Sequence, residues 1–180
     1  MIIRTARTSD APGIAAIYEP IVRDTFISFE TEPPSSQEMA ERIENTLKSH
    51  PWLVAESDGG VIGYAYAGPH RTRPAYQWSC DVSVYLAPGS KRTGTGRKLY
   101  SRLFEILGRQ GFAMAFAGIA LPNGASVGFH EAMGFEFIGQ YPRVGFKKGE
   151  WRDVGWWHRP IQELGTAPRE PLGFAEVGKR

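Results

Sequence analysis

A basic turn near the middle of the chain contains the residue types that bind phosphate. Lys91, Arg92 and Arg97 supply positive charge, and Gly94 and Gly96 let a ligand approach the backbone because they lack a Cβ atom. The turn leads into an amphipathic helix, whose first N–H groups have no helical partner and whose dipole is positive at this end. The spacing predicts a pyrophosphate-bearing cofactor at the start of this helix. An ordinary capped helix start with solvated basic residues fits the same pattern.

Length and composition limit the class of protein. With 180 residues, 42% of them hydrophobic, the chain is long enough for one domain with its own core. The formal net charge of +2 does not indicate a nucleic-acid partner. The single cysteine, Cys80, excludes an intrachain disulfide, and no CxxC or HxxxH spacing indicates a metal. No signal peptide and no run of about 18 apolar residues is present, so we expect a cytoplasmic protein without a membrane partner.

Hydrophobic periodicity predicts strands and helices that alternate along the chain. The expected strands cover residues 2–7, 52–56, 61–67, 78–86, 112–121, 135–146 and 152–160. Helices are expected to begin near residues 10, 35, 95 and 125, and Pro20 predicts a kink or an early end in the first of them. This order predicts an α/β fold, a mixed sheet with helices on both faces. We expect one domain over residues 1–164 and a loosely ordered tail over residues 165–180, where prolines, glycines and charges mix without a period.

The element order and the basic turn with its Gly-x-Gly resemble the GCN5-related N-acetyltransferase (GNAT) superfamily. Separated motifs narrow the resemblance to the phosphinothricin N-acetyltransferase family. These motifs are Trp52–Glu56, Tyr64–Pro69, Gly118–Asn123, His130–Phe135 and Gly145–Gly149, followed by Trp151 and Asp153–Gly155. The likeness extends from about Ile3 to Trp157. It implies a splayed mixed sheet of about seven strands with about four flanking helices, and a homodimer.

The resemblance also implies an activity. It implies acetyl transfer from acetyl-CoA to the amine of a small amino acid such as phosphinothricin, methionine sulfoximine or methionine sulfone. The amine would attack the thioester directly in a ternary complex, without a metal. One alternative is a CoA-binding sensor or interaction protein that has lost turnover. Another is a nucleotide-binding module, although the turn lacks the Lys-Ser/Thr ending of a P-loop.

The resemblance assigns the cofactor to a strand end and to the basic turn. The strand before the turn would leave its neighbour and present free backbone groups to the pantetheine arm. The implied cofactor-binding residues are Val84, Tyr85, Leu86, Arg92, Thr93, Gly94, Thr95, Gly96, Arg97 and Asn123. Asn123 also fits a helix N-cap. The superfamily usually has Gln or Arg where this chain has Lys91, and lysine lacks the bidentate geometry of arginine.

Asp81 and His130 are the catalytic residues that the resemblance implies. An ammonium group must lose a proton before it attacks a thioester, and this requires a base. Asp81 occupies the position of a glutamate in the family, and the shorter side chain reduces its reach by about 1.5 Å. His130 matches the histidine of the family's His-Glu-Ala-x-Gly motif. The same residues also fit a buried, paired carboxylate and a histidine satisfied on a helix surface.

Arg71, Arg73 and Tyr76 are the implied substrate-binding residues. The planar fork of arginine suits carboxylate and phosphinate oxygens. The same segment also fits an exposed connection between strands. Phe29 is expected to wall the pocket. Three tryptophans near the C-terminus are expected in core or dimer packing: Trp151, Trp156 and Trp157.

Overall fold

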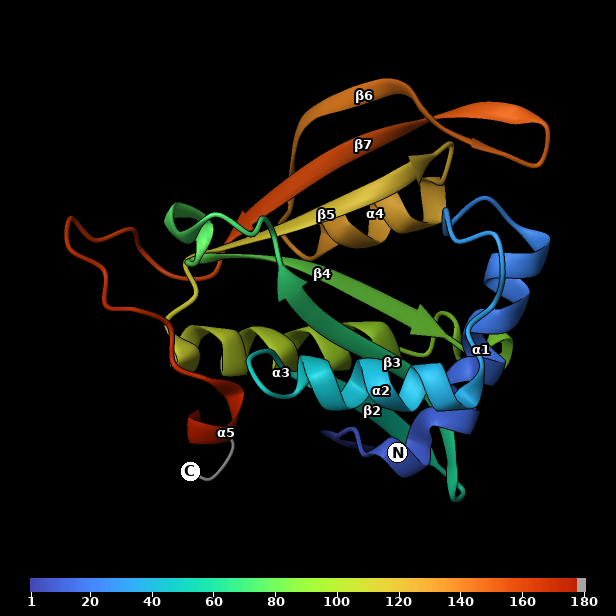
Figure 1. Ribbon diagram of the computed structural model, residues 1–180, viewed down its shortest axis with the longest axis horizontal. Coiled ribbons are helices and arrows are strands. Elements are labelled where there is room, and N and C mark those ends of the chain that lie inside the picture. The colour runs from blue at the N-terminus through green and yellow to red at the C-terminus, as the bar shows by residue number, and fades with distance from the viewer. Residues whose placement is uncertain (178–180) are drawn as a thin grey trace.

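The structure, a computed structural model, describes residues 1–177, and seven strands of this part of the chain form one sheet (Figure 1). The strands are β1 (Ile2–Thr5), β2 (Trp52–Ser57), β3 (Gly60–Pro69), β4 (Ser79–Leu86), β5 (Met114–Leu121), β6 (Glu136–Lys147) and β7 (Glu150–Pro160). Their order across the sheet is β1-β2-β3-β4-β5-β7-β6. Neighbours are antiparallel except β4 and β5, which are parallel. The predicted α/β class and mixed sheet are confirmed.

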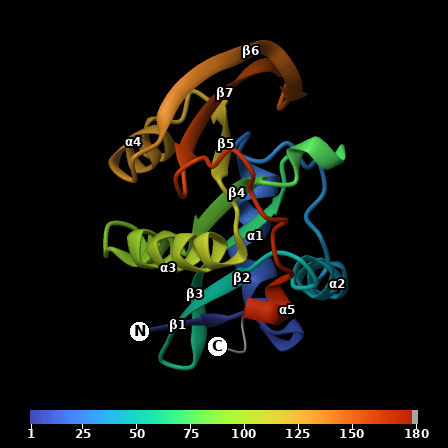
Figure 2. The same ribbon diagram turned by 90° about the vertical axis from the view of Figure 1, so that its left-hand side faces the viewer.

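Helices cover both faces of this sheet (Figure 2). The helices are α1 (Ala11–Asp24), α2 (Ser36–Thr46), α3 (Thr95–Gln110), α4 (Gly124–Ala132) and α5 (Phe174–Val177). On one face, α1 and α2 pack against the sheet around Val22, Ile43 and Val54. On the other face, α3 packs around Leu103 and Ala115, and α4 contributes apolar side chains at the margin of this core. The molecule therefore has two cores, one on each side of the sheet.

Helix α1 does not end at Pro20, so the predicted early end is wrong. The helix continues to Asp24, with Pro20 in its interior. Proline removes one backbone hydrogen bond from a helix interior. Ile14, Tyr18 and Val22 lie on the same side of α1 and are buried, and the burial of this face stabilises the helix on both sides of the proline.

Strands β4 and β5 pair over a short stretch and then separate. Their register runs from Ser79 opposite Met114 to Asp81 opposite Phe116. Figure 1 shows the two strands diverging toward their C-terminal ends. Strand β4 continues to pair with β3 as far as Leu86. Beyond Asp81, the edge of β4 that faces β5 therefore has no strand partner.

The C-terminal segment packs against the domain, in contrast to the loosely ordered tail that we predicted. The Leu172 N–H donates to the Gln110 carbonyl at 2.7 Å, and the Gln110 side-chain amide donates to the Leu172 carbonyl at 2.8 Å. Phe174 and Val177 are buried, so two apolar residues anchor a polar segment. Residues 178–180 of the predicted tail lie outside the described residues.

Candidate active site

Strand β4 alternates polar and apolar side chains. Cys80 and Val82 are buried in the core that contains α3. Tyr85 packs against the core that contains α1 and α2. Because side chains alternate along a strand, Asp81 and Ser83 lie on the same face of the sheet as Tyr85. The polar face of β4 thus points away from α3.

Asp81 pairs with His70, a residue that the sequence analysis did not select. The His70 Nδ1 atom lies 2.6 Å from Asp81 Oδ1. The His70 side chain is 12% exposed, and its ring stacks on Phe116 with 4.2 Å between centroids. Burial raises the pKa of the Asp81 carboxyl, while the hydrogen bond with His70 and the charges of His70 and Arg71 act to lower it. A carboxylate–imidazole pair therefore lies where β4 and β5 separate.

Three further side chains surround this pair. Tyr76 and Trp156 approach the His70 ring edge-on, with centroids 6.0 and 5.9 Å away. The Arg71 guanidinium lies 5.6 Å from the centroid of the Trp156 ring. Arg73 is exposed and makes no side-chain interaction within the described chain. The structure thus gathers two of the three predicted substrate-binding residues here. It also places Trp156 beside them, a residue for which the sequence predicts core or dimer packing.

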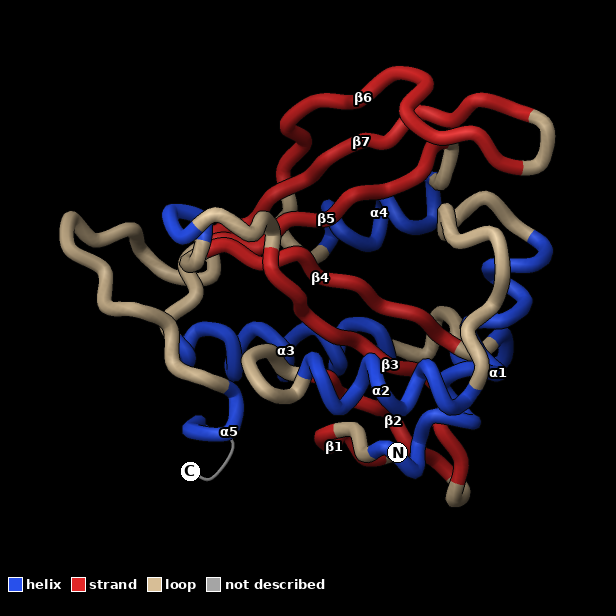
Figure 3. The backbone as a smooth tube through the Cα atoms, viewed as in Figure 1, coloured by secondary structure: helices blue, strands red, loops and turns tan. Residues whose placement is uncertain are grey.

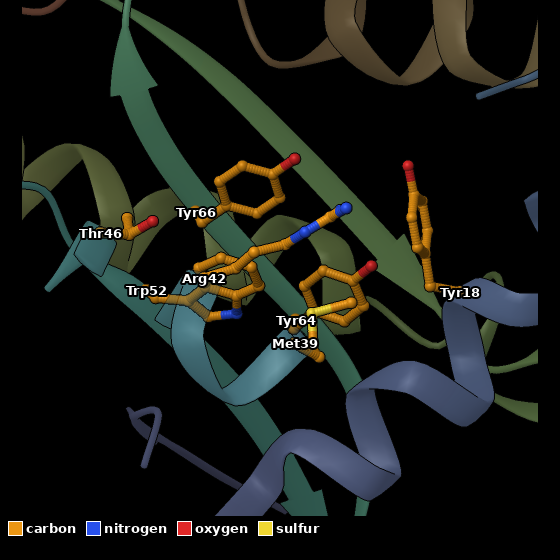
Figure 4. Close-up of a pocket in the computed structure, with 7 residues that line it drawn as sticks. All are labelled: Tyr18, Met39, Arg42, Thr46, Trp52, Tyr64 and Tyr66. Carbon is orange, nitrogen blue, oxygen red and sulfur yellow. The ribbon is translucent and has the colours of Figure 1, made fainter. Parts of the chain in front are cut away.

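A cavity of about 140 Å³ lies on the same side of the sheet, beside α1 and α2 (Figure 4). It is lined by Tyr18, Met39, Arg42, Thr46, Trp52, Tyr64 and Tyr66. Tyr66 lies opposite Ser83 in the β3–β4 register, and Ser83 is two residues beyond Asp81 on β4. Tyr18 and Arg42 both donate to the Glu30 carboxylate, at 2.9 and 2.8 Å. No local sequence pattern predicts this cavity, because its lining residues come from α1, α2, β2 and β3.

The loop after α1 is fastened to the β6–β7 hairpin, which lies next to it in Figure 3. The buried Lys147 ammonium donates at 2.7 Å to three main-chain carbonyls, those of Val22, Ser28 and Glu30. The Phe29 ring lies directly against Gly145 of β6, in the space that a Cβ atom there would need. Lys147 therefore holds the loop that contains Phe29 and Glu30 in one position.

The turn before α3 has the features of an anion site. Arg92 and Gly94 adopt left-handed backbone conformations, with φ of 62° and 81°. The hydroxyls of Thr93 and Thr95 are 2.8 Å apart, so these side chains brace the turn internally. Gly94 offers no side-chain cap, and the Lys98 N–H makes the first backbone hydrogen bond of the helix. The preceding N–H groups are therefore free to bind a phosphate.

The free edge of β4 includes two of the three predicted strand residues. The Ala87 N–H donates to the Ile62 carbonyl, so odd-numbered residues of this strand bond to β3. The N–H and C=O groups of Val84 and Leu86 consequently face the side on which β5 has diverged. The main-chain groups of Tyr85 face β3 instead, so its prediction as a backbone ligand does not fit this register.

Asn123 and His130 both belong to the α4 segment and have structural partners. The Asn123 side chain caps the helix by accepting from the Ser126 N–H at 3.2 Å. His130 is 5% exposed, with Nδ1 2.8 Å from the Ser126 carbonyl and Nε2 3.0 Å from the Tyr100 hydroxyl. Burial lowers the pKa of the His130 imidazole, against the effect of the Ser126 carbonyl. A neutral His130 therefore donates through Nδ1–H and accepts from Tyr100, and no described contact joins it to Asp81.

Residues 1–177 contain no group of three or more histidine, cysteine or acidic side chains placed to hold a metal ion. The helices of this part of the chain include none that is both long enough and apolar enough to cross a membrane.

The fold is that of an acetyltransferase family. A family model described as an acetyltransferase (GNAT) domain matches residues 3–156, and the chain belongs to this family. The phosphinothricin N-acetyltransferase of Streptomyces viridochromogenes is 40% identical over 167 residues, which cover 93% of this chain and 91% of the relative. The resemblance to the phosphinothricin N-acetyltransferase family is thus confirmed.

Two further relatives bear on cofactor and substrate. The L-methionine sulfoximine/L-methionine sulfone acetyltransferase of Salmonella typhimurium is 34% identical over 164 residues, 91% of this chain and 96% of the relative. Among solved structures, a phosphinothricin acetyltransferase from Sinorhizobium meliloti in complex with acetyl-CoA superposes with a TM-score of 0.87. It is 36% identical and the match covers 94% of this chain and 92% of that chain.

Proposed function

We propose that this chain transfers the acetyl group of acetyl-CoA to the amine of a small amino acid such as phosphinothricin, methionine sulfoximine or methionine sulfone. The observation that carries the proposal is the position of the Asp81–His70 pair. It lies at the last paired residue of β4, between a free strand edge and a loop that contains Arg71. The substrates named for the relatives support the choice of acceptor.

The residues present fit acetyl-CoA at two places. The free N–H groups at the start of α3, together with Arg92 and Arg97, suit a diphosphate. The free main-chain groups of Val84 and Leu86 suit the amides of a pantetheine arm, which would pair with β4 as an added strand. When bound, acetyl-CoA supplies the activated acyl group. Asn123 caps α4, and a role in binding the cofactor is not needed to explain its position.

Proton removal is proposed for the region of Asp81. An amino acid is mostly an ammonium ion at neutral pH, so a neighbouring base must accept its proton. The amine nitrogen then bonds to the acyl carbon while the carbon–sulfur bond breaks. The Val84 N–H, on the free edge of β4, is placed to stabilise negative charge on the acyl oxygen. His130 has no nitrogen available for this step, and we propose that its hydrogen bond with Tyr100 stabilises the packing of α4 on α3.

Acceptor recognition is proposed for the side of the sheet opposite α3. Arg71 is the cation nearest the Asp81–His70 pair in the described contacts, and its guanidinium suits a carboxylate or phosphinate. Tyr76 and Trp156 provide flat walls beside it. The cavity lined by Tyr66, which lies opposite Ser83 in the β3–β4 register, offers space for the rest of the amino acid. Arg73 stays a prediction, supported only by its place on the same loop.

The test is release of free thiol from acetyl-CoA by the purified chain with a panel of amino acids. Amine-dependent release, with phosphinothricin and methionine sulfoximine among the best acceptors, is the expected result. Tight binding of CoA without release for any amino acid would favour the alternative of a CoA-binding sensor. Asp81→Asn should lower kcat about 100-fold while leaving acetyl-CoA affinity unchanged. Asp58→Asn, in the exposed β2–β3 turn, is the matched control.

We also propose that the chain forms a homodimer through the β6–β7 hairpin. Strand β6 is an edge of the sheet, and the hairpin exposes an unusual number of large apolar side chains. These are Phe137, Ile138, Tyr141, Val144, Phe146 and Trp151, all between 49% and 61% exposed. Trp157, in contrast, is buried in the core. The cytoplasmic location expected from the sequence stays a prediction.

Light scattering with size-exclusion chromatography tests the dimer. The expected mass is twice that of the 20.0 kDa chain. Trp151→Glu should shift the protein to monomer because it places a charge in the apolar surface. Leu164→Glu changes an exposed apolar residue outside the hairpin and should leave the dimer intact. A monomeric mass for the unmodified protein would contradict the proposal.

A further inference from the structure

His70 is placed to do more than pair with a carboxylate. We propose that His70 Nε2 is the atom that accepts the proton of the amine, while Asp81 holds the imidazole in the required tautomer and orientation. The inference rests on the proposed acetyltransferase function and assigns its base. No other histidine of the described chain contacts a carboxylate in this way.

The contact between the two side chains determines the tautomer. With Nδ1 2.6 Å from Asp81 Oδ1, a neutral imidazole donates its Nδ1–H to the carboxylate. Nε2 then carries the lone pair and is the basic nitrogen. After proton transfer, the imidazolium is stabilised by the adjacent negative charge. The Asp81 carboxylate therefore orients the neutral imidazole before the reaction and stabilises the imidazolium that forms.

The surroundings orient the ring and leave Nε2 available. The ring is stacked on Phe116, at 18° between planes, and Tyr76 and Trp156 contact it edge-on. The Nε2 atom has no hydrogen-bond partner in the described chain. It does not belong to the polar atoms that are buried without a partner, so Nε2 is accessible to solvent. Packing on several sides with one free nitrogen is the arrangement that general-base catalysis requires.

The position of the Asp81–His70 pair in the sheet also supports the proposal. Asp81 is the last residue of β4 that pairs with β5, so His70 lies where the free strand edge begins. The His70 ring stacks on Phe116, the β5 residue opposite Asp81, so the imidazole lies over the last pair of residues before the two strands separate. The charged and titratable groups that face His70 are Asp81 on β4 and Arg71 and Tyr76 on the loop after β3. Strands β5 and β7 contribute Phe116 and Trp156, which do not titrate, and the titratable His158 of β7 lies beside the Phe116 ring.

His70 Nε2 takes one proton from the ammonium group, which leaves a neutral amine and an imidazolium paired with Asp81. The amine forms the N–C bond to the acyl carbon, the C–S bond breaks with its electron pair on sulfur, and the second nitrogen proton passes to the thiolate. The products are the acetamide and CoA as a thiol. The imidazolium then returns its proton to solvent, so one proton is released per turnover.

The test compares His70→Ala, Asp81→Asn and the double variant in the thiol-release assay, together with acetyl-CoA affinity by calorimetry. His70→Ala should lower kcat about 100-fold and leave the affinity for acetyl-CoA unchanged. Added imidazole should then raise the kcat of His70→Ala about tenfold. The double variant should be no slower than the slower single variant, because residues that act as one unit are not additive. His158→Ala is the matched control, since His158 also stacks near Phe116 but has no carboxylate partner among the described contacts.

Four results would overturn the inference. If the wild-type protein is active and His70→Ala is equally active, His70 is not the base, and the proposed function still stands. Losses that multiply in the double variant refute a coupled pair. A wild-type chain that releases no thiol with any amino acid refutes the proposed function and the base together. If the variants do not fold, nitrogen NMR of the wild-type His70 ring decides: a proton on Nε2 rather than Nδ1 in the neutral form refutes the assignment.

Discussion

Two histidines of this chain lie in regions with opposite properties. His130 is enclosed between α3 and α4, where Tyr100, Phe129 and Phe135 contact its ring and both nitrogens are hydrogen-bonded. His70 lies at the end of β3, with one nitrogen on a carboxylate and the other free. His130 matches a family motif, yet His70 has the environment of a base. Satisfied hydrogen bonds and burial are typical of a packing residue, and a free nitrogen beside a carboxylate is the environment that we propose for the base.

The largest expected effect that separates the two regions is on stability. His130→Ala removes a buried ring and leaves the Tyr100 hydroxyl without its partner, so the free energy of unfolding should fall by about 3 kcal/mol. The kcat of the remaining folded protein should change by less than about threefold. His70→Ala should show the reverse pattern. Urea unfolding and kcat, measured on both variants, check this comparison. A large loss of kcat in stably folded His130→Ala would mean that the closed region also carries chemistry.

A smaller effect is expected at Gly96, which borders the His130 region. A Cβ atom there would lie 3.2 Å from the Phe129 ring and 3.6 Å from a Leu86 methyl group. Gly96→Ala should therefore push α4 outward and raise the KM for acetyl-CoA about fivefold, although alanine normally favours a helix. Gly124→Ala is the control, because nothing lies within 4 Å of its Cβ position. An unchanged KM would show that Phe129 adjusts without disturbing the cofactor side.

The smallest expected effect is the pH dependence of stability. Burial lowers the pKa of His130, so the folded state favours the neutral imidazole and the unfolded state binds more protons below the ordinary value. His130 should therefore reduce stability as the pH falls below about 6.5, by about 1 kcal/mol between pH 7 and pH 5.5. His50, whose pKa is also lowered by burial, contributes in the same direction. The difference between wild type and His130→Gln isolates the effect of His130, and identical slopes would contradict its burial as a neutral group.

Several features of the site are readable from local sequence because they depend on neighbouring residues alone. Gly94 adopts a left-handed conformation in a turn that the glycines and basic residues predict. The turn at Asp58-Gly59 between β2 and β3 is likewise predicted by its own residue types, and both residues have positive φ. The alternation Asp81, Val82, Ser83 identifies a strand with one polar face. Gly96 is a different case, since the contact with Phe129 shows that packing of α4 on α3 also requires a small residue there.

Other features depend on residues far apart in the chain. Sequence reasoning missed His70 because its partner, Asp81, is eleven positions away and its packing partners Phe116 and Trp156 come from β5 and β7. It placed Trp156 in the core or dimer because a tryptophan in a strand does not reveal which neighbour it contacts. It also assigned a loosely ordered tail, since the two buried anchors Phe174 and Val177 are too few to form a periodic pattern.

The sequence by itself determined the class of fold, the basic turn at a helix start and the polar face of β4, because periodicity and turn chemistry act over a few residues. Only the tertiary structure decided which histidine has a free nitrogen, where β4 leaves β5 and which loop is fastened by Lys147. These depend on the register of distant strands and on which side chains exclude water from one another. Such long-range contacts leave no local pattern in the chain.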